Sequence, residues 1–200
     1  MIALIDYNMG NLCSVSNALN AVGAEYRIID NGSELDKFDK IILPGVGNFG
    51  DGMEHLQARN FVEPLKQAVA ADIPFLGVCV GLQMLFDNSE EAPGAVGLGI
   101  IKGSIIRFPS GIEKVPHMGW NNVSFKVDHP LLDGVDSDTY FYFVHSYHAA
   151  PVNPDEVIGE CEYIVKFPAI VGRGKLFATQ FHPEKSQAPG LRIYKNFTDL

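Results

Sequence analysis

Short apolar runs alternate with helix-like segments along the first half of the chain. Residues 2–5, 26–29, 40–43 and 75–78 are mainly apolar and short enough to be buried strands. Helical spacing predicts helices over residues 13–22, which stop near Gly23, and over 62–70. Apolar runs separated by helices are typical of a parallel sheet that is covered on both faces.

The second half of the chain has a different pattern. Strand-like segments follow one another closely, at residues 104–108, 122–127, 140–147, 163–171 and 176–180, and a helix is expected only at 192–197. Closely spaced strands favour antiparallel pairing. We therefore predict an α/β fold with a mostly parallel central sheet and antiparallel strands in the second half, and interpret residues 88–99 as a loop.

Length and charge narrow the possible functions. Two hundred residues suffice for one domain with a sizeable core, and we predict a single domain over 1–200. A net charge of −9, with only 15 Lys and Arg, argues against a nucleic-acid partner or a polybasic membrane anchor. The start of the chain shows no signal-peptide pattern, and no apolar run approaches the roughly 20 residues of a membrane helix. A cytoplasmic location without membrane contact is expected.

Three widely spaced cysteines match neither a disulfide framework nor a zinc site. We therefore expect no metal and no cofactor. Cys13 and Cys161 lack any flanking motif and are interpreted as ordinary core thiols. Cys79 is different because glycines stand two residues before and two residues after it.

The segment Gly77-Val78-Cys79-Val80-Gly81 follows a predicted strand and precedes a helix-like run, 82–86. This is the pattern of a nucleophile elbow with Cys in place of Ser. A helix N-terminus favours the thiolate, and the Val80 N–H could supply half of an oxyanion hole. A buried structural cysteine at a tight turn fits the pentapeptide about equally well.

A candidate base and its orienting carboxylate come much later in the chain. Phe181-His182-Pro183-Glu184 follows the predicted strand 176–180, so the His182 ring could be oriented by Glu184 while it acts as a base. Alone, this segment fits a surface turn. Together with the Cys79 elbow it predicts a Cys–His–Glu triad.

A glycine-rich loop follows the predicted strand 40–43. Its sequence, Pro44-Gly45-Val46-Gly47-Asn48, lacks the Lys-Ser/Thr that completes a phosphate-binding loop. A plain turn is the other interpretation. Beside the Cys79 elbow we favour a second oxyanion donor from Val46 or Gly47, with glycines that would let the Val46 peptide turn over.

Two further histidines, His145 and His148, could suggest a metal pair. A continuous strand would place them on opposite faces, and no Cys or carboxylate cluster stands nearby. A structural role or a place at the rim of the site is the favoured interpretation.

Three segments together resemble the triad-type (class I) glutamine amidotransferases: residues 44–47, 77–83 and 181–186. More narrowly, the chain is similar from end to end to the glutaminase subunits of imidazole glycerol phosphate synthases, including residues 5–12 and 116–121. Val80 stands where the family often has Leu, which matters little for a backbone donor. The resemblance implies a Rossmann-like three-layer sandwich.

The resemblance also implies roles for individual residues. Cys79 would be the nucleophile, His182 the general base and then acid, and Glu184 its orienter. Val46, Gly47 and Val80 would form the oxyanion hole. Gln83, Ser146 and Tyr147 would line the glutamine pocket.

A (β/α)8-barrel cyclase that makes imidazole glycerol phosphate in histidine biosynthesis is the partner that the resemblance implies. Trp120 and the loop that contains Tyr7, Asn8 and Asn11 are the candidate interface residues; a core position for Trp120 is equally compatible with composition. Three other functions remain open. One is a paralogous glutaminase that feeds another synthase, for example in surface-sugar amination, and another is a non-catalytic binding subunit. The third is a stand-alone thiol hydrolase of γ-glutamyl compounds, which would need no partner.

Overall fold

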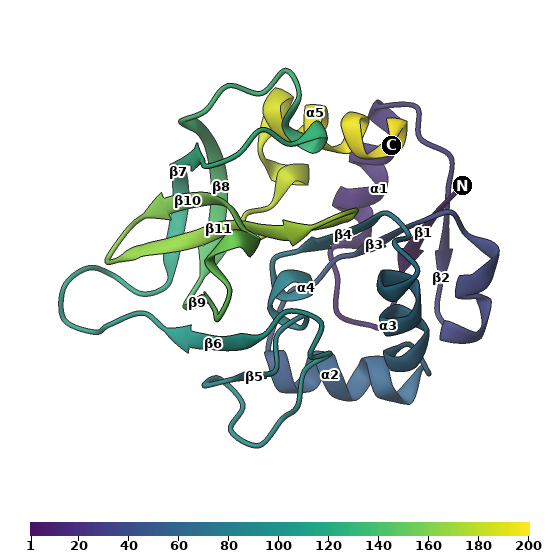
Figure 1. Cartoon of the computed structure of the whole chain (residues 1–200), viewed down its shortest axis with the longest axis horizontal. Helices are drawn as coiled ribbons and strands as arrows, with labels where there is room; N and C mark the ends of the chain where they lie inside the picture. Colours follow the sequence, from purple (N-terminus) through teal and green to yellow (C-terminus); the bar gives the residue numbers. More distant parts are fainter.

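A nine-stranded sheet runs through the computed structural model, which describes residues 1–200 (Figure 1). Its first five strands in spatial order are parallel: β2 (Tyr26–Ile29), β1 (Ile2–Ile5), β3 (Lys40–Leu43), β4 (Phe75–Val78) and β12 (Leu176–Thr179). The remaining four are antiparallel: β11 (Lys166–Arg173), β10 (Val157–Glu162), β7 (His117–Phe125) and β8 (Thr139–His145).

Helices cover both faces of the parallel half. The chain passes from β1 to β2 in one direction along the sheet and from β3 to β4 in the other, so right-handed crossovers place the intervening helices on opposite faces. Accordingly α1 (Leu12–Ala21) and α5 (Gln187–Asp199) lie on one face, and α2 (Phe49–Ala58) and α3 (Val62–Ala70) lie on the other (Figure 1). The predicted α/β class with helices on both faces of the sheet is confirmed.

Shorter elements complete the chain. A second sheet pairs β5 (Asn88–Ser89) with β6 (Gly103–Arg107), and β6 with β9 (Tyr147–Pro151). The short helices are α4 (Val80–Gln83), η1 (Gly32–Lys37), η2 (Pro130–Leu132), η3 (Pro154–Glu156) and η4 (Pro183–Lys185). No helix has both the length and the apolar character needed to cross a bilayer.

The structure corrects several predicted elements. Helix α2 was not predicted; it begins directly after the glycine-rich loop, where Asn48 caps it through Gly50 N and Asp51 N. Strand β10 was not predicted. The strand expected over 140–147 is interrupted at Ser146, where the chain passes from β8 in the large sheet to β9 in the small one.

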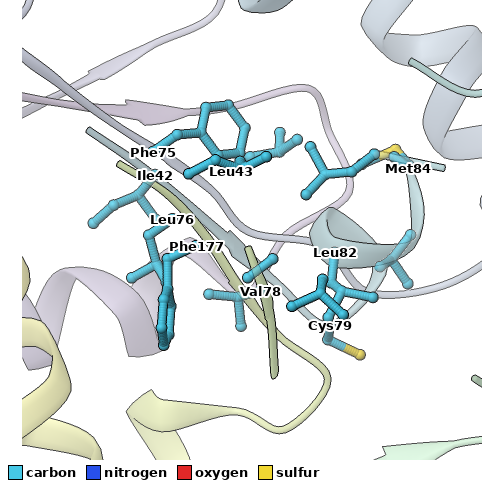
Figure 2. Packing of buried hydrophobic residues seen from close by; sticks show 14 of the residues in the cluster. Ile42, Leu43, Phe75, Leu76, Val78, Cys79, Leu82, Met84 and Phe177 are labelled. Carbon is cyan, nitrogen blue, oxygen red and sulfur yellow. The ribbon is translucent and has the colours of Figure 1, made fainter. Parts of the chain in front are cut away.

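The strand order places the three loops that carry the predicted catalytic residues side by side. The carboxyl ends of β3, β4 and β12 are neighbours at one edge of the sheet, and ligands of open α/β sheets bind at such an edge. The residues before that edge, such as Leu43, Val78 and Phe177, are buried in one hydrophobic cluster (Figure 2). A rigid, closely packed base therefore supports the loops that follow.

Candidate active site

Cys79 connects β4 to α4 through a backbone conformation that is rare for a residue with a side chain. Its φ is 55° and its ψ is −109°, which costs about 1–3 kcal/mol. Its N–H donates to the Thr179 carbonyl at 2.8 Å, and its carbonyl accepts from Gln83 N at 3.2 Å. Figure 2 shows its sulfur pointing away from the packed side chains of Val78 and Leu82. The elbow thus presents the thiol at the edge of the core.

Backbone packing explains the glycines around the cysteine. A Cβ on Gly81 would lie 2.0 Å from the Leu43 carbonyl oxygen, so only glycine allows α4 to approach β3. A Cβ on Gly45 would lie 2.6 Å from Gly81 N and 2.7 Å from the Tyr7 hydroxyl. The elbow and the loop after β3 therefore pack backbone against backbone, which brings the Val46 peptide beside Cys79.

His182 follows β12 and is held from several sides. Its Nδ1 lies 2.7 Å from Glu184 Oε1, and both side chains are almost completely buried. The Tyr194 hydroxyl donates to the other carboxylate oxygen of Glu184 at 3.4 Å. The His182 N–H donates to the Tyr142 carbonyl at 2.9 Å, and the Ser186 hydroxyl donates to the His182 carbonyl at 2.6 Å. The ring is therefore fixed in orientation.

The surroundings of His182 favour its charged form. Burial alone lowers the pKa of His182, but the Cys79 sulfur and then Glu184 outweigh it and raise this pKa to about 10. The His182 Nε2 is buried without a hydrogen-bond partner, so it is free to exchange a proton with a reacting group. Helix α4 has only four residues and contributes little dipole. The long helix dipole expected from the sequence behind Cys79 is therefore absent, and the charged group beside the sulfur is the His182 ring.

Two of the three N–H groups expected in the oxyanion hole, those of Val46 and Val80, are engaged in backbone hydrogen bonds. The Val46 N–H donates to the Met9 carbonyl at 3.4 Å, and the Val80 N–H donates to the Gly45 carbonyl at 3.4 Å. Both bonds are longer than a good N–H···O bond. Gly47, with a φ of +99°, gives the loop the freedom to change conformation.

A pocket of about 320 Å³ lies beside the elbow. It is lined by all eight residues predicted for the nucleophile, the base, the oxyanion hole and the substrate: Val46, Gly47, Cys79, Val80, Gln83, Ser146, Tyr147 and His182. Four others also line it: Glu91, Pro116 and Val144, which sequence reasoning missed, and His145, for which a structural role or a place at the rim was expected. Four larger hollows, of about 390, 520, 840 and 1140 Å³, contain no cysteine. The smaller pocket is the one that can support nucleophilic chemistry.

Gln83 is buried at the base of this pocket. Its Nε2 donates to the Tyr147 carbonyl at 3.2 Å and to Gln180 Oε1 at 3.2 Å, which leaves its carbonyl oxygen for a ligand. The amide of Gln180 in turn donates to Cys79 Sγ at 3.8 Å. Gln180 is thus a further side chain in contact with the nucleophile, which sequence reasoning did not identify.

Glu91 places a carboxylate at the pocket wall. Its Oε2 accepts a hydrogen bond from Phe49 N, at the start of α2, at 2.8 Å. One carboxylate oxygen is thereby anchored, and the other can pair with a cationic group such as the ammonium of an amino acid. No sequence motif marked Glu91, because it lies in the segment interpreted as a featureless loop.

The candidate interface residues differ in exposure. Trp120 is 47% exposed, so the core alternative for it is wrong. Asn8 is exposed, whereas Asn11 is half-buried and caps α1 through Ser14 N. Tyr7 is completely buried beneath the loop after β3, so its side chain is inaccessible to a partner and its predicted place in the interface is wrong.

The structure also tests what the sequence predicted for two other cysteines and two histidines. Cys161 is a buried thiol as predicted, but Cys13 is exposed because it falls on the outer face of α1. His145 and His148 do not lie on opposite faces: both rings contact Phe108, with centroids 5.2 and 4.7 Å away. The interruption at Ser146 turns both histidines into the same aromatic cluster.

Comparison with known proteins agrees with this geometry. The family described as glutamine amidotransferase class-I matches residues 3–199, and the chain belongs to that family. It is 50% identical to imidazole glycerol phosphate synthase subunit HisH of Methanocaldococcus jannaschii, with the whole of both chains covered. It is 46% identical to the subunit of the same name from Sulfurimonas denitrificans, over 99% of this chain and 97% of that one.

Solved structures show the same fold at low sequence identity. The structure of PurLQS from Thermotoga maritima superposes with a TM-score of 0.80 at 18% identity, covering 99% of this chain and 97% of that chain. The family and the enzyme class expected from the three sequence segments are confirmed by the family match and the full-length relatives: the protein is a class I glutamine amidotransferase.

Proposed function

We propose that this subunit hydrolyses glutamine through Cys79, His182 and Glu184 and delivers the ammonia to a (β/α)8-barrel cyclase that makes imidazole glycerol phosphate. The observation that carries the chemical part is the buried His182–Glu184 bond of 2.7 Å, with the unpartnered Nε2 of His182 in the same pocket as Cys79. The names of the full-length relatives support the pathway.

The first half of the reaction forms a thioester. The Cys79 thiolate attacks the carboxamide carbon of glutamine, and the carbonyl π electrons move to oxygen. Protonated His182 then gives its Nε2 proton to the amide nitrogen, so that the C–N bond breaks and ammonia leaves. Glu184 stabilises the imidazolium and keeps the ring in the orientation that this transfer requires.

Neutral His182 serves as the base in the second half. It takes a proton from a water molecule that attacks the γ-glutamyl thioester, and the C–S bond breaks to release glutamate and restore the thiolate. At the amino-acid end of the substrate, Glu91 would pair with the α-ammonium group, while the Gln83 carbonyl oxygen and the Ser146–Tyr147 segment complete the pocket. No metal or cofactor takes part in these steps.

The oxyanion requires a donor that is now engaged elsewhere. For Val46 N–H to face the developing oxyanion, its peptide must turn over and release the Met9 carbonyl; the same movement frees Val80 N–H from the Gly45 carbonyl. The two long bonds, and the conformational freedom of Gly45 on one side of the turning peptide, support a small cost for this change. We infer that partner binding drives it, so that glutamine is hydrolysed only when an ammonia acceptor is ready.

Exposed apolar side chains beside the pocket support a docking face for the cyclase. Met118 and Trp120 on β7 and Tyr140 on β8 are 63%, 47% and 59% exposed. Val144, on the same strand as Tyr140, lines the pocket itself. Large exposed side chains of this kind are typical of interaction surfaces. A partner seated here would lie next to the point where ammonia is formed.

The test is glutamate release from glutamine by the purified chain, with and without the barrel cyclase and its nucleotide ligand, and with Cys79→Ala in parallel. Strong stimulation by the cyclase that disappears in the variant is expected. Cys79-dependent activity that ignores the cyclase would assign the enzyme to another ammonia-using pathway. Absence of turnover in every mixture would contradict the proposed chemistry.

A further inference from the structure

Two buried histidines lie beside the glutamine pocket, on the face of the β7–β8 ladder opposite to Trp120. His117 on β7 and His145 on β8 are direct cross-strand partners in the antiparallel ladder. Their rings meet edge to edge, with His117 Nδ1 3.0 Å from His145 Nε2. His117 is 3% and His145 5% exposed. The proposed mechanism uses neither ring, although His145 lines the pocket.

Their hydrogen bonds allow one arrangement of protons. His145 Nδ1 lies 2.8 Å from the Tyr147 carbonyl, which can only accept, so Nδ1 must carry the proton. A neutral His145 then accepts through Nε2 from His117 Nδ1–H. The remaining His117 Nε2 faces the Asn121 amide nitrogen at 3.4 Å, which donates. Both rings are therefore Nδ1–H tautomers.

The environment keeps both rings neutral at physiological pH. Burial lowers the pKa of His117 to about 4 and that of His145 to about 3. Tyr163 stacks on His117 with centroids 4.2 Å apart, and the nearby His182 is the cationic group that faces His145. A charged His145 would need a second acceptor where His117 now donates, so neutrality and tautomer are fixed together.

Hydrogen bonds connect the histidine pair to the wall of the substrate pocket. The Tyr147 carbonyl that accepts from His145 is the same atom that accepts from Gln83 Nε2 at 3.2 Å. Gln83 also donates a hydrogen bond to Gln180, which in turn donates to the Cys79 sulfur. The chain turns at Ser146 from one sheet to the other, and the His145 bond joins a side chain of the large sheet to the backbone of this turn.

We propose that His117 and His145 are positioning residues for glutamine binding: as a neutral, tautomer-fixed pair they hold the Tyr147 carbonyl, and through it Gln83, in the geometry that the pocket requires. This inference rests on the proposed glutaminase function. In this proposal the two histidines, which are not part of the triad, fix the conformation of the Ser146–Tyr147 segment.

The test compares two alkylation rates of Cys79 in the full chain, followed by mass spectrometry. A chloroketone analogue of glutamine needs the pocket, whereas iodoacetamide needs only the thiolate. In His145→Phe and His117→Phe, which keep an aromatic ring and remove both nitrogens, we expect the ratio of the analogue rate to the iodoacetamide rate to fall about tenfold. His145→Asn, which keeps a donor near the Nδ1 position, should recover most of the ratio.

His148→Phe is the matched control. Its ring packs against the same Phe108 and Phe167 rings, yet its hydrogen bond goes to the neighbouring Ala149 carbonyl and it does not line the pocket. It should keep the wild-type ratio. An equal loss in His148→Phe, or a wild-type ratio in His145→Phe, would overturn the proposal. A wild-type chain without preference for the analogue would instead overturn the glutaminase function.

Imidazole NMR of the unaltered chain tests the same proposal without substitutions. Long-range nitrogen–proton spectra should show Nδ1–H tautomers for His117 and His145, with no protonation between about pH 5 and 8. A proton on Nε2 of neutral His145, or titration of either ring in this range, would contradict the fixed pair even if the variants failed to fold.

Discussion

Glu184 Oε1 and His182 Nδ1 lie 2.7 Å apart with both side chains almost completely buried. A buried carboxylate this close to an imidazole fixes the ring and stabilises its charged form. In Glu184→Gln we expect kcat for glutamine to fall by roughly 10²-fold or more, because an amide can orient the ring but cannot stabilise the imidazolium. Steady-state glutamate release in the presence of the partner measures this.

Glu156→Gln is a useful comparison for that variant. Glu156 is also a buried carboxylate in an ion pair, with Arg173, but it lies outside the pocket. It should alter stability and leave kcat close to that of the wild type. If Glu184→Gln behaved in the same way, Glu184 would be structural only.

The charge of His182 should depend on Cys79. The Cys79 sulfur is the first of the influences that raise the pKa of His182 to about 10 against burial. Replacement of Cys79 by Ala should therefore lower this pKa, which an NMR titration of the ring can follow; Cys161→Ala should leave it unchanged. The pKa of His182 is higher in the folded than in the unfolded chain, so protonated His182 stabilises the folded state. This contribution to the free energy of unfolding is complete below about pH 6.5 and is lost as the pH rises towards 10.

Glu91 should control the affinity for glutamine rather than the chemical step. In Glu91→Gln we expect KM to rise about 10- to 100-fold with little change in kcat, since a charged hydrogen bond to the α-ammonium group would be weakened in ground and transition states alike. Glu90→Gln is the matched control, because Glu90 is exposed and bonds to Arg107 N instead. An unchanged KM in Glu91→Gln would remove Glu91 from the substrate site.

The parallel half of the fold was predictable because each buried strand is a continuous apolar run. Helix α2 was not, because Gly50 and Gly52 weaken the local helical signal. Tertiary packing explains Gly52, where a Cβ would lie 2.8 Å from Met84 Sδ. Strand β10 alternates apolar and polar positions around Gly159, too weakly to be recognised. In both elements, contacts distant in sequence decide the structure.

The candidate site likewise contains residues that the sequence identified and residues that it did not. Motifs with fixed spacing, such as the glycines around Cys79, identify residues whose backbone must adopt a special conformation. Glu91 and His145 carry no such spacing. His145 reaches the pocket because β8 ends there, and Glu91 reaches it because the loop before β6 folds back. Local sequence encodes neither arrangement. The burial of Tyr7 has the same origin, since the loop after β3 covers it.

Gly81 should be intolerant of even one methyl group. A Cβ there would lie 2.0 Å from the Leu43 carbonyl oxygen, and neither backbone can move without shifting the elbow. Gly81→Ala is expected to lower the free energy of unfolding by at least ~3 kcal/mol. Gly94→Ala, at a φ of +92° with open space around it, should cost only about 1–2 kcal/mol. Urea unfolding of both variants gives the comparison.

Trp120 should contribute to partner binding and not to folding. It is 47% exposed on β7 and contacts the ring of Tyr142 edge-on, with centroids 6.1 Å apart. In Trp120→Ala we expect the affinity for the barrel cyclase to fall by about 2 kcal/mol, roughly 30-fold, with an unchanged melting temperature of the isolated chain. Val152→Ala, which truncates a side chain that is 76% exposed, should leave the affinity unchanged. Calorimetric titration measures both, and equal affinities for the two variants would place the cyclase on another face.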